Sequence, residues 1–294
     1  MSEIVIHKID NWFRFIKLIN EYSTIQRPPD YSLKSIFRGH ADRNWKLSSS
    51  LERKYIPKSG LFEISKGPNG VEWFRSKCDH ILNKFRENIE GSNLSINIDI
   101  KNDNELWALG RHHGLLTPLL DWTFNPFVAA FFAFYEFYKV YEYSYFHPAF
   151  KQNQFAYIYR LHLKNDAFVE NEFELVKVKS KVGSRLYAQQ GVFTILKHNE
   201  YLDIETYLGA NNKLEYLEIF RLPATMTCEA IEFLEDMNIK ISTLFPDING
   251  SALQANIDND TVSFNHKVTH MLNKDKNNGT QHSSKAKPNS QALN

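Results

Sequence analysis

The chain has 294 residues, 43% of them hydrophobic, which is enough for one large folded domain or two small ones. With 35 basic and 34 acidic residues, its formal net charge of +1 does not indicate a nucleic acid or an anionic membrane as partner. The two cysteines, Cys78 and Cys228, form neither a CxxC pair nor a zinc-binding pattern, so we expect no metal site and a reducing compartment.

The N-terminus lacks the charged-then-apolar layout of a signal peptide, and no window approaches about eighteen unbroken apolar residues. We therefore expect a cytoplasmic protein that does not enter a membrane. The first predicted element is a helix over residues 10–25, which carries apolar residues at helical spacing and has Asp10 as its N-cap.

Residues 35–38 form the first predicted strand, which ends at Gly39 and delivers Arg38 and His40 to the strand end. A guanidinium at such a position offers a planar fork to phosphate or carboxylate. An arginine there equally serves as a structural salt-bridge residue, so the strand alone does not decide its role.

Helices follow in the next part of the chain. Composition predicts a surface loop over residues 57–71 and a helix over 72–90. A further helix from Glu105 should stop at His112 and His113, because Gly114 suits the C′ position that follows a helix end.

A mostly buried helix is predicted after the extended piece 115–121. Thr123 or Asn125 can cap this helix, Pro126 suits its first turn, and from residue 127 apolar side chains occupy more than one stripe. Helix N-termini attract anions, because their unpaired N–H groups and their dipole point outward. We therefore expect a ligand near the polar cluster at 112–125.

The rest of the chain alternates strands and helices and then becomes polar. A tail with almost no apolar side chains cannot bury enough surface to order itself. We predict one α+β domain over residues 1–255 and a disordered tail over 256–294. The expected later elements are strands at 155–163, 174–182, 192–196 and 214–222, a short helix or turn from 184, and a helix at 227–237.

Common catalytic signatures are absent, since the chain has no P-loop, GxGxxG, GxSxG or HExxH motif. Its candidate chemistry lies in three polar segments, which are residues 38–40, 112–123 and 189–191. Each segment also has an ordinary structural explanation: the histidines as helix caps, Asp121 as a carboxylate satisfied by backbone N–H groups, and the glutamines as a buried turn.

Several motifs in order resemble the FRG domain family over roughly residues 8–250. Where that family has Pro before Thr117 and Arg after it, this chain has Leu116 and Pro118. The matching residues are Phe37, Arg38, Gly39, Trp45, Leu47, Leu51 and Arg53, then 112–115 with Thr117, 119–123, Asn125, Pro126, Ala129, Phe132 and Ala133, and finally 188–193 and 243–246.

A weaker similarity is to ADP-ribosyltransferases. It implies a split mixed or antiparallel sheet in an α+β fold and NAD as substrate, with Arg38 holding the phosphates and Thr123 beside the nicotinamide. Gln190 or Gln189 stands where those enzymes have a Glu. A neutral amide cannot supply the negative charge that stabilises a developing cation. The remaining residues expected at the cofactor are Gly39, His40, Thr117 and Trp122.

Asp121 and His113 are the other candidate catalytic residues, as electrostatic stabiliser and as general acid or base. The leading hypothesis is an NAD-dependent ADP-ribosyltransferase that modifies a protein or nucleic acid acceptor as a toxin or defence effector, with a protein partner or regulator. An NAD glycohydrolase is the other enzyme that fits the same resemblance. One alternative is a non-catalytic module that binds a nucleotide or a protein. Another is a metal-independent nuclease using His113 and Asp121.

Overall fold

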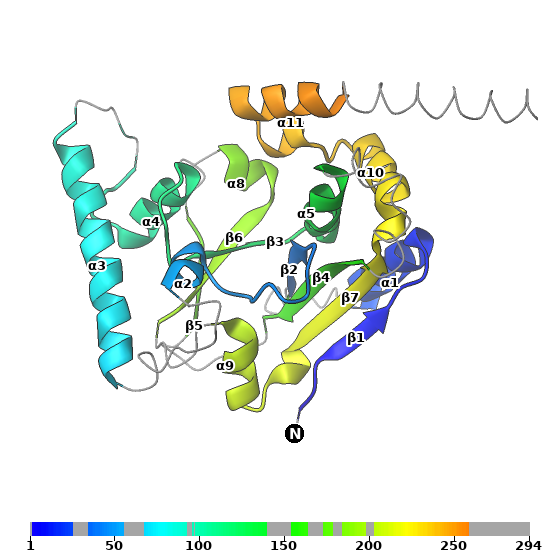
Figure 1. Ribbon diagram of the computed structural model, residues 1–294, viewed down its shortest axis with the longest axis horizontal. Coiled ribbons are helices and arrows are strands. Elements are labelled where there is room, and N and C mark those ends of the chain that lie inside the picture. Colours follow the sequence, from blue (N-terminus) through cyan, green and yellow to red (C-terminus); the bar gives the residue numbers. More distant parts are fainter. Residues whose placement is uncertain are drawn as a thin grey trace, which may run out of the picture.

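The protein forms an α+β unit around one seven-stranded mixed sheet, which confirms the predicted fold class (Figure 1). The strand order is β1-β7-β4-β2-β3-β6-β5. The computed structural model describes residues 2–25, 35–55, 68–92, 96, 98–139, 154–163, 173–178, 184–197 and 203–258. A helical segment over residues 248–258 runs past the predicted domain end at 255 into the first three residues of the predicted tail, and the rest of that tail lies outside the described residues.

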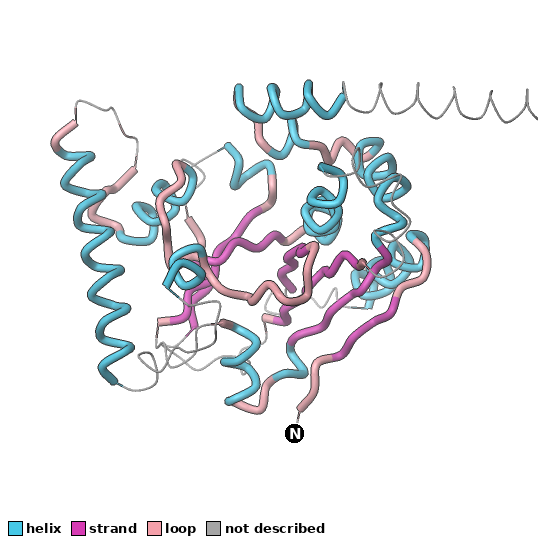
Figure 2. The backbone as a smooth tube through the Cα atoms, viewed as in Figure 1, coloured by secondary structure: helices cyan, strands magenta, loops and turns pink. Residues whose placement is uncertain are grey.

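Figure 2 shows the strands crossing the middle of the molecule. Among the described strands, β1 and β7 pair in parallel and the other pairs are antiparallel. The strands are β1 (Val5–Lys8), β2 (Ser35–His40), β3 (Leu120–Thr123), β4 (Phe155–His162), β5 (Phe173–Val176), β6 (Gly191–Leu196) and β7 (Leu217–Pro223).

The sheet is narrowest between β2 and β3. Strand β2 pairs with β4 along its whole length, but it pairs with β3 only where Phe37 lies opposite Thr123. The sheet therefore consists of two wings, β1-β7-β4-β2 and β3-β6-β5, which this single residue pair joins. We call the place where they meet the junction. The strands thus form one continuous sheet with a narrow join, and the ADP-ribosyltransferase-like split stays a prediction.

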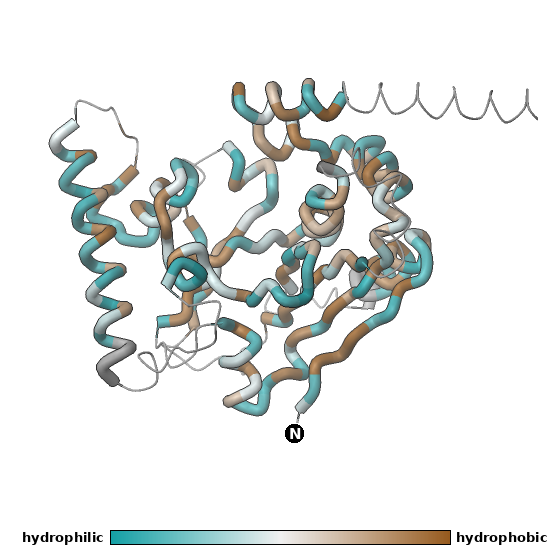
Figure 3. Tube along the Cα trace, viewed as in Figure 1, coloured by the Kyte–Doolittle hydropathy of each residue, from teal (hydrophilic) through white to brown (hydrophobic). Residues whose placement is uncertain are grey.

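Helices cover the sheet and its ends. Figure 1 shows α3 at one end of the molecule and α1 with α10 at the other, and Figure 3 shows that α3 is largely hydrophilic along its length. The helices are α1 (Trp12–Ile25), α2 (Ser50–Tyr55), α3 (Pro68–Glu90), α4 (Asp103–His112), α5 (Pro126–Lys139), α8 (Ser184–Ala188), α9 (Ile204–Ala210), α10 (Thr227–Asp236) and α11 (Ile241–Leu244), with 3-10 turns η3 (Leu214–Tyr216) and η4 (Ala224–Met226).

Some predicted boundaries were wrong. Helix α3 begins at Pro68, inside the predicted loop 57–71, and residues 57–67 lie outside the described part of the chain. Strand β7 begins at Leu217 because residues 214–216 form a 3-10 turn. The weak strand candidate at 174–182 is strand β5 only as far as Val176, and its last residues, 179–182, are not described.

Side-chain caps explain where two of the helices begin. Asn11, rather than the predicted Asp10, caps α1, since its Oδ1 accepts a hydrogen bond from the Arg14 backbone N–H at 2.8 Å. Asn125 caps α5 as expected, with its Oδ1 accepting from the Phe127 N–H at 2.9 Å. Helix α4 ends at the histidine pair, and the glycine that follows has the left-handed φ of 89° that a C′ residue favours.

Alternate residues of the central strands enter different cores, as the two-residue period of a strand requires. Phe37, Ile158 and Phe220 pack with α1, α5 and α10. Ile36 and Tyr159 pack on the other face with α9. A third core lies between α3, α4 and the β5–β6 edge. Within the described residues, no helix combines the length and the apolar character needed to span a bilayer.

Candidate functional site

A pocket of about 620 Å³ lies at the junction of the two wings, within the range of about 300–1,000 Å³ that is usual for small-molecule sites. Strands β2, β3 and β6 and helices α2, α4, α5 and α8 all contribute to it. Its lining comprises Phe37, Arg38, Gly39, His40, Trp45, Arg53, Ala108, Arg111, His112, Asp121, Trp122, Thr123, Ala129, Phe132, Glu136, Arg185, Leu186, Gln189, Gly191, Phe193 and Phe245.

The structure brings most of the sequence-predicted site residues together in this pocket. Segment 38–40 lies in the lining, as do Asp121, Trp122 and Thr123 from the second segment and Gln189 from the third. The three segments therefore meet in space, although more than 60 residues separate each from the next, as the bond from Thr123 Oγ1 to the Gln189 carbonyl oxygen shows for the last two.

Three predicted site residues do not line the pocket, and local backbone geometry explains each of them. His113 is the exposed C-cap residue of α4. Gln190 is an exposed turn residue with φ of 48°, and its carbonyl oxygen accepts from the Phe124 N–H. Thr117 is fully buried, and its backbone holds α2 through hydrogen bonds with Ser50 Oγ and the Leu51 N–H. His113, Gln190 and Thr117 thus lie outside this pocket, and a role for them at a ligand stays a prediction.

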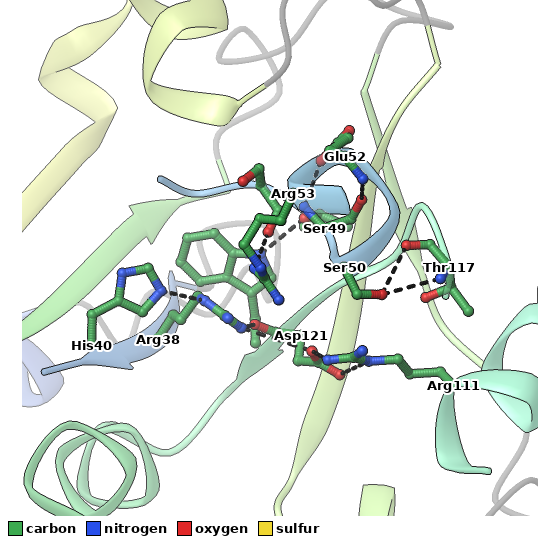
Figure 4. A network of polar contacts seen from close by, with 12 residues as sticks. Arg38, His40, Ser49, Ser50, Glu52, Arg53, Arg111, Thr117 and Asp121 are labelled. Atoms are coloured by element: carbon green, nitrogen blue, oxygen red, sulfur yellow. Dashed lines mark hydrogen bonds and ion pairs between the residues drawn. The ribbon is translucent and has the colours of Figure 1, made fainter. Parts of the chain in front are cut away.

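Arg38 lies across the junction, where the main-chain ladder between β2 and β3 stops. Its Nη1 donates to the Asp121 carbonyl oxygen at 2.6 Å, and its Nε donates to His40 Nε2 at 2.8 Å (Figure 4). Burial lowers the pKa of Arg38 to about 10, so it remains a cation at neutral pH. Burial, together with the nearby Arg38, lowers the pKa of His40 to about 2, so its imidazole is a neutral acceptor.

Asp121 is the anion at the centre of the arginines. Both of its carboxylate oxygens accept from Arg111, with Arg111 Nε at 3.2 Å and Nη2 at 2.6 Å, and Arg38 Nη1 lies 3.9 Å away. Burial opposes ionisation of Asp121, but the Arg111 and Arg38 guanidinium groups outweigh it and hold the pKa of the carboxyl below its usual value. Asp121 is therefore ionised at neutral pH.

Gly39 permits the close approach that forms the pocket floor. A Cβ atom at this position would lie 1.9 Å from the Ala129 carbonyl oxygen of α5 and 2.6 Å from the Ala133 nitrogen. Only glycine fits such a contact between a strand and a helix backbone. This contact places the predicted Arg-Gly pair directly beside the first half of the buried helix.

The third segment forms the far wall of the pocket. Thr123 Oγ1 donates to the Gln189 carbonyl oxygen at 2.7 Å, and Gln189 Nε2 donates to the Leu244 carbonyl oxygen at 3.1 Å. The indole of Trp122 is almost completely buried and donates from Nε1 to Thr194 Oγ1 at 2.9 Å. The hydrogen bonds of Thr123, Gln189 and Trp122 thus stabilise this wall of the pocket.

Sequence reasoning missed several lining residues that carry charge. Arg53 was named only as one of the residues that match the FRG domain family. Arg111 is a cation next to the end of α4, where it suits the helix dipole without any ligand. Glu136 and Arg185 carried no signal in the sequence. Arg185 Nε donates to Asp247 Oδ2, and its guanidinium lies over the Phe245 ring, 5.0 Å from the centroid. Four arginines thus face two carboxylates, Asp121 and Glu136, in the lining.

The fold and this site define an α+β domain with an arginine-rich, aromatic-walled binding pocket at the junction of its sheet. Residues 33–140 match the sequence model of the FRG domain. The chain therefore contains an FRG domain, and the matched segment begins just before β2 and ends just after α5. Neither the curated proteins nor the solved structures yielded a match, so the ADP-ribosyltransferase-like arrangement stays a prediction.

Proposed function

We propose that the junction pocket binds NAD and that the domain transfers its ADP-ribose group to a macromolecule. The observation that carries the proposal is the excess of arginine over carboxylate in a pocket of nucleotide-binding size. Guanidinium groups recognise phosphate oxygens through paired hydrogen bonds. Aromatic walls, formed by side chains such as Trp45 and Phe132, suit the flat rings of a dinucleotide.

The reaction breaks the bond between nicotinamide and ribose, and an acceptor nucleophile takes the place of nicotinamide. A negative charge near the ribose stabilises the cationic transition state of such a step. Gln190, which stands where ADP-ribosyltransferases have a Glu, lies outside the pocket. The lining offers two carboxylates for this role, Asp121 and Glu136. Nicotinamide release should therefore depend on one of these two side chains.

The test is incubation with NAD labelled in its ADP-ribose part, in the presence of a cell lysate, with nicotinamide release and label on protein or nucleic acid as readouts. Arg38→Ala and Glu136→Gln change the pocket. Arg43→Ala is the control, because Arg43 makes a bidentate pair with Glu205 but does not line the pocket. Release that Arg38→Ala abolishes and Arg43→Ala retains would support the proposal. Equal release from all variants would refute it.

Binding without turnover is the second candidate. Its support is that Arg111 occupies both carboxylate oxygens of Asp121 and that the amide of Gln189 is bonded to Leu244. In this case NAD raises the melting temperature through preferential binding to the folded state, without nicotinamide release. The same samples distinguish the two functions.

A nuclease is not proposed, because its two residues are not assembled: Asp121 lines the pocket, whereas His113 is exposed outside it. The role as a toxin or defence effector, the protein regulator and the cytoplasmic location remain expectations from the resemblance and the sequence.

A further inference from the structure

The four arginines of the pocket differ in how their donors are used. Arg38 donates to His40 and to the Asp121 backbone, and Arg111 donates to both carboxylate oxygens of Asp121. Arg185 is paired with Asp247. Three of the four guanidinium groups are therefore hydrogen-bonded to another side chain, which fixes their place in the pocket wall.

Arg53 is the exception. Within the described part of the chain, its guanidinium makes one hydrogen bond, from Nη1 to the Ser48 carbonyl oxygen, and no carboxylate lies within 4.0 Å of it. Its side chain is exposed, and Figure 4 shows it extending from α2 toward Arg38 and Asp121. Its remaining N–H donors are therefore available to an anion in the pocket.

The helix that carries Arg53 is firmly held. Ser49 and Glu52 form a capping box, since the Ser49 N–H donates to Glu52 Oε2 and the Glu52 N–H donates to Ser49 Oγ. Leu51 is completely buried, and its N–H donates to the Thr117 carbonyl oxygen. A guanidinium mounted on such a support loses little freedom when it binds a ligand.

Charge in this part of the pocket indicates the class of ligand. Arg38, Arg53 and Arg111 supply three positive charges and Asp121 supplies one negative charge, which leaves an excess of two. A group with two negative charges balances this excess, and a single carboxylate does not. Diphosphate is such a group, and it offers several oxygens to a planar fork.

We propose that Arg53 is the residue that directly contacts the diphosphate of the ligand, whereas Arg38 and Arg111 are positioning residues that hold Asp121 and the junction. This inference rests on the proposed function for NAD as the ligand. The sequence resemblance assigned the phosphate contact to Arg38, but Nε and Nη1 of Arg38 already donate to His40 and to the Asp121 carbonyl oxygen, which fixes this guanidinium at the junction.

The experiment measures the affinity of the full chain for inorganic pyrophosphate and for NAD by calorimetry at several salt concentrations. Arg53→Gln is compared with Arg53→Lys and with Lys54→Gln. Lys54 is the matched control, because it is the next residue of α2, carries the same charge and does not line the pocket. A charge-assisted hydrogen bond is worth roughly a tenfold to hundredfold change in affinity, so Arg53→Gln should weaken both ligands by that factor.

The dependence of pyrophosphate affinity on salt concentration distinguishes a residue that contacts the diphosphate from one that only positions the pocket wall. Arg53→Gln should flatten the dependence of pyrophosphate affinity on salt without changing the melting temperature of the free protein, and Arg53→Lys should restore part of the affinity. Arg38→Gln should lower the melting temperature but keep the wild-type salt dependence.

Wild-type affinity for pyrophosphate in Arg53→Gln would overturn the inference, and so would a wild-type protein that binds no pyrophosphate. Arg53-dependent binding of pyrophosphate without any binding of NAD would support the inference while refuting the proposed function.

Discussion

Glu52 should make the stability of the protein depend on pH around neutrality. The side chain is 4% exposed, and burial raises the pKa of Glu52 from 4.5 to about 7. The Ser49 hydrogen bonds and Arg53 oppose this shift, and Asp203 adds to it. Cys78 of α3 also interacts electrostatically with this carboxyl. A carboxyl that must ionise inside the protein destabilises the folded state.

The sign of the effect follows from proton binding. The folded protein holds the Glu52 proton more tightly than the unfolded chain does, so this group lowers the free energy of unfolding as pH rises from 4.5 to about 7. Above that range the loss is complete and amounts to roughly 3 kcal/mol, at about 1.4 kcal/mol for each tenfold change in proton affinity.

Glu52→Gln isolates this effect. Glutamine keeps the oxygen that accepts from the Ser49 N–H, but it carries no charge at any pH. Urea unfolding followed by circular dichroism between pH 4.5 and 8.5 should show similar stabilities at the acid end and a variant that is more stable by on the order of 3 kcal/mol at the alkaline end. Glu87→Gln, at an exposed ion pair with Lys84 on α3, controls for the change in net charge. Parallel pH profiles for wild type and Glu52→Gln would refute the reasoning.

Three further outcomes follow from local geometry. Gly39→Ala forces a Cβ to within 1.9 Å of the Ala129 oxygen, so urea unfolding should show a loss of about 3 kcal/mol or more, and a loss under about 1 kcal/mol would contradict the packing. Asn125→Ala removes the cap on the Phe127 N–H, and the same assay should show a loss of about 1 kcal/mol; unchanged stability would mean that α5 does not depend on this cap. Burial raises the pKa of Cys78 to about 12, so mass spectrometry should show slow alkylation by iodoacetamide at pH 8 in the native protein and rapid alkylation in urea; equal rates would contradict that burial.

Local signals in the sequence predicted the elements that position the site. Gly114 marked the end of α4, and Asn125 with Pro126 marked the start of α5, because a few adjacent residues determine where a helix begins and ends. The strand that carries Arg38 was also predicted from adjacent residues, with Gly39 taken as its end, but it runs two residues further than expected. The three polar segments that the sequence singled out lie near one another in the structure, but the sequence did not indicate every side chain that meets there.

What the sequence did not predict depends on contacts between distant residues. Arg111 pairs with Asp121 only because the chain turns back after α4, and Glu136 faces the pocket only because α5 packs against β2. Gln190 was expected at the ligand, but the left-handed turn that it forms leaves its side chain exposed. Strand β1 and helix α9 were missed because each is short, and tertiary contacts decide whether such segments form an element.

The narrow join of the sheet has a consequence for motion. With Phe37 and Thr123 as the one residue pair between β2 and β3, little of the main-chain hydrogen bonding crosses from one wing to the other, so each wing forms its own unit of local opening. A ligand in the pocket contacts both wings and ties them together. Amide hydrogen exchange in β3 and β6 should then slow when the pocket fills, which makes the junction itself a reporter of occupancy.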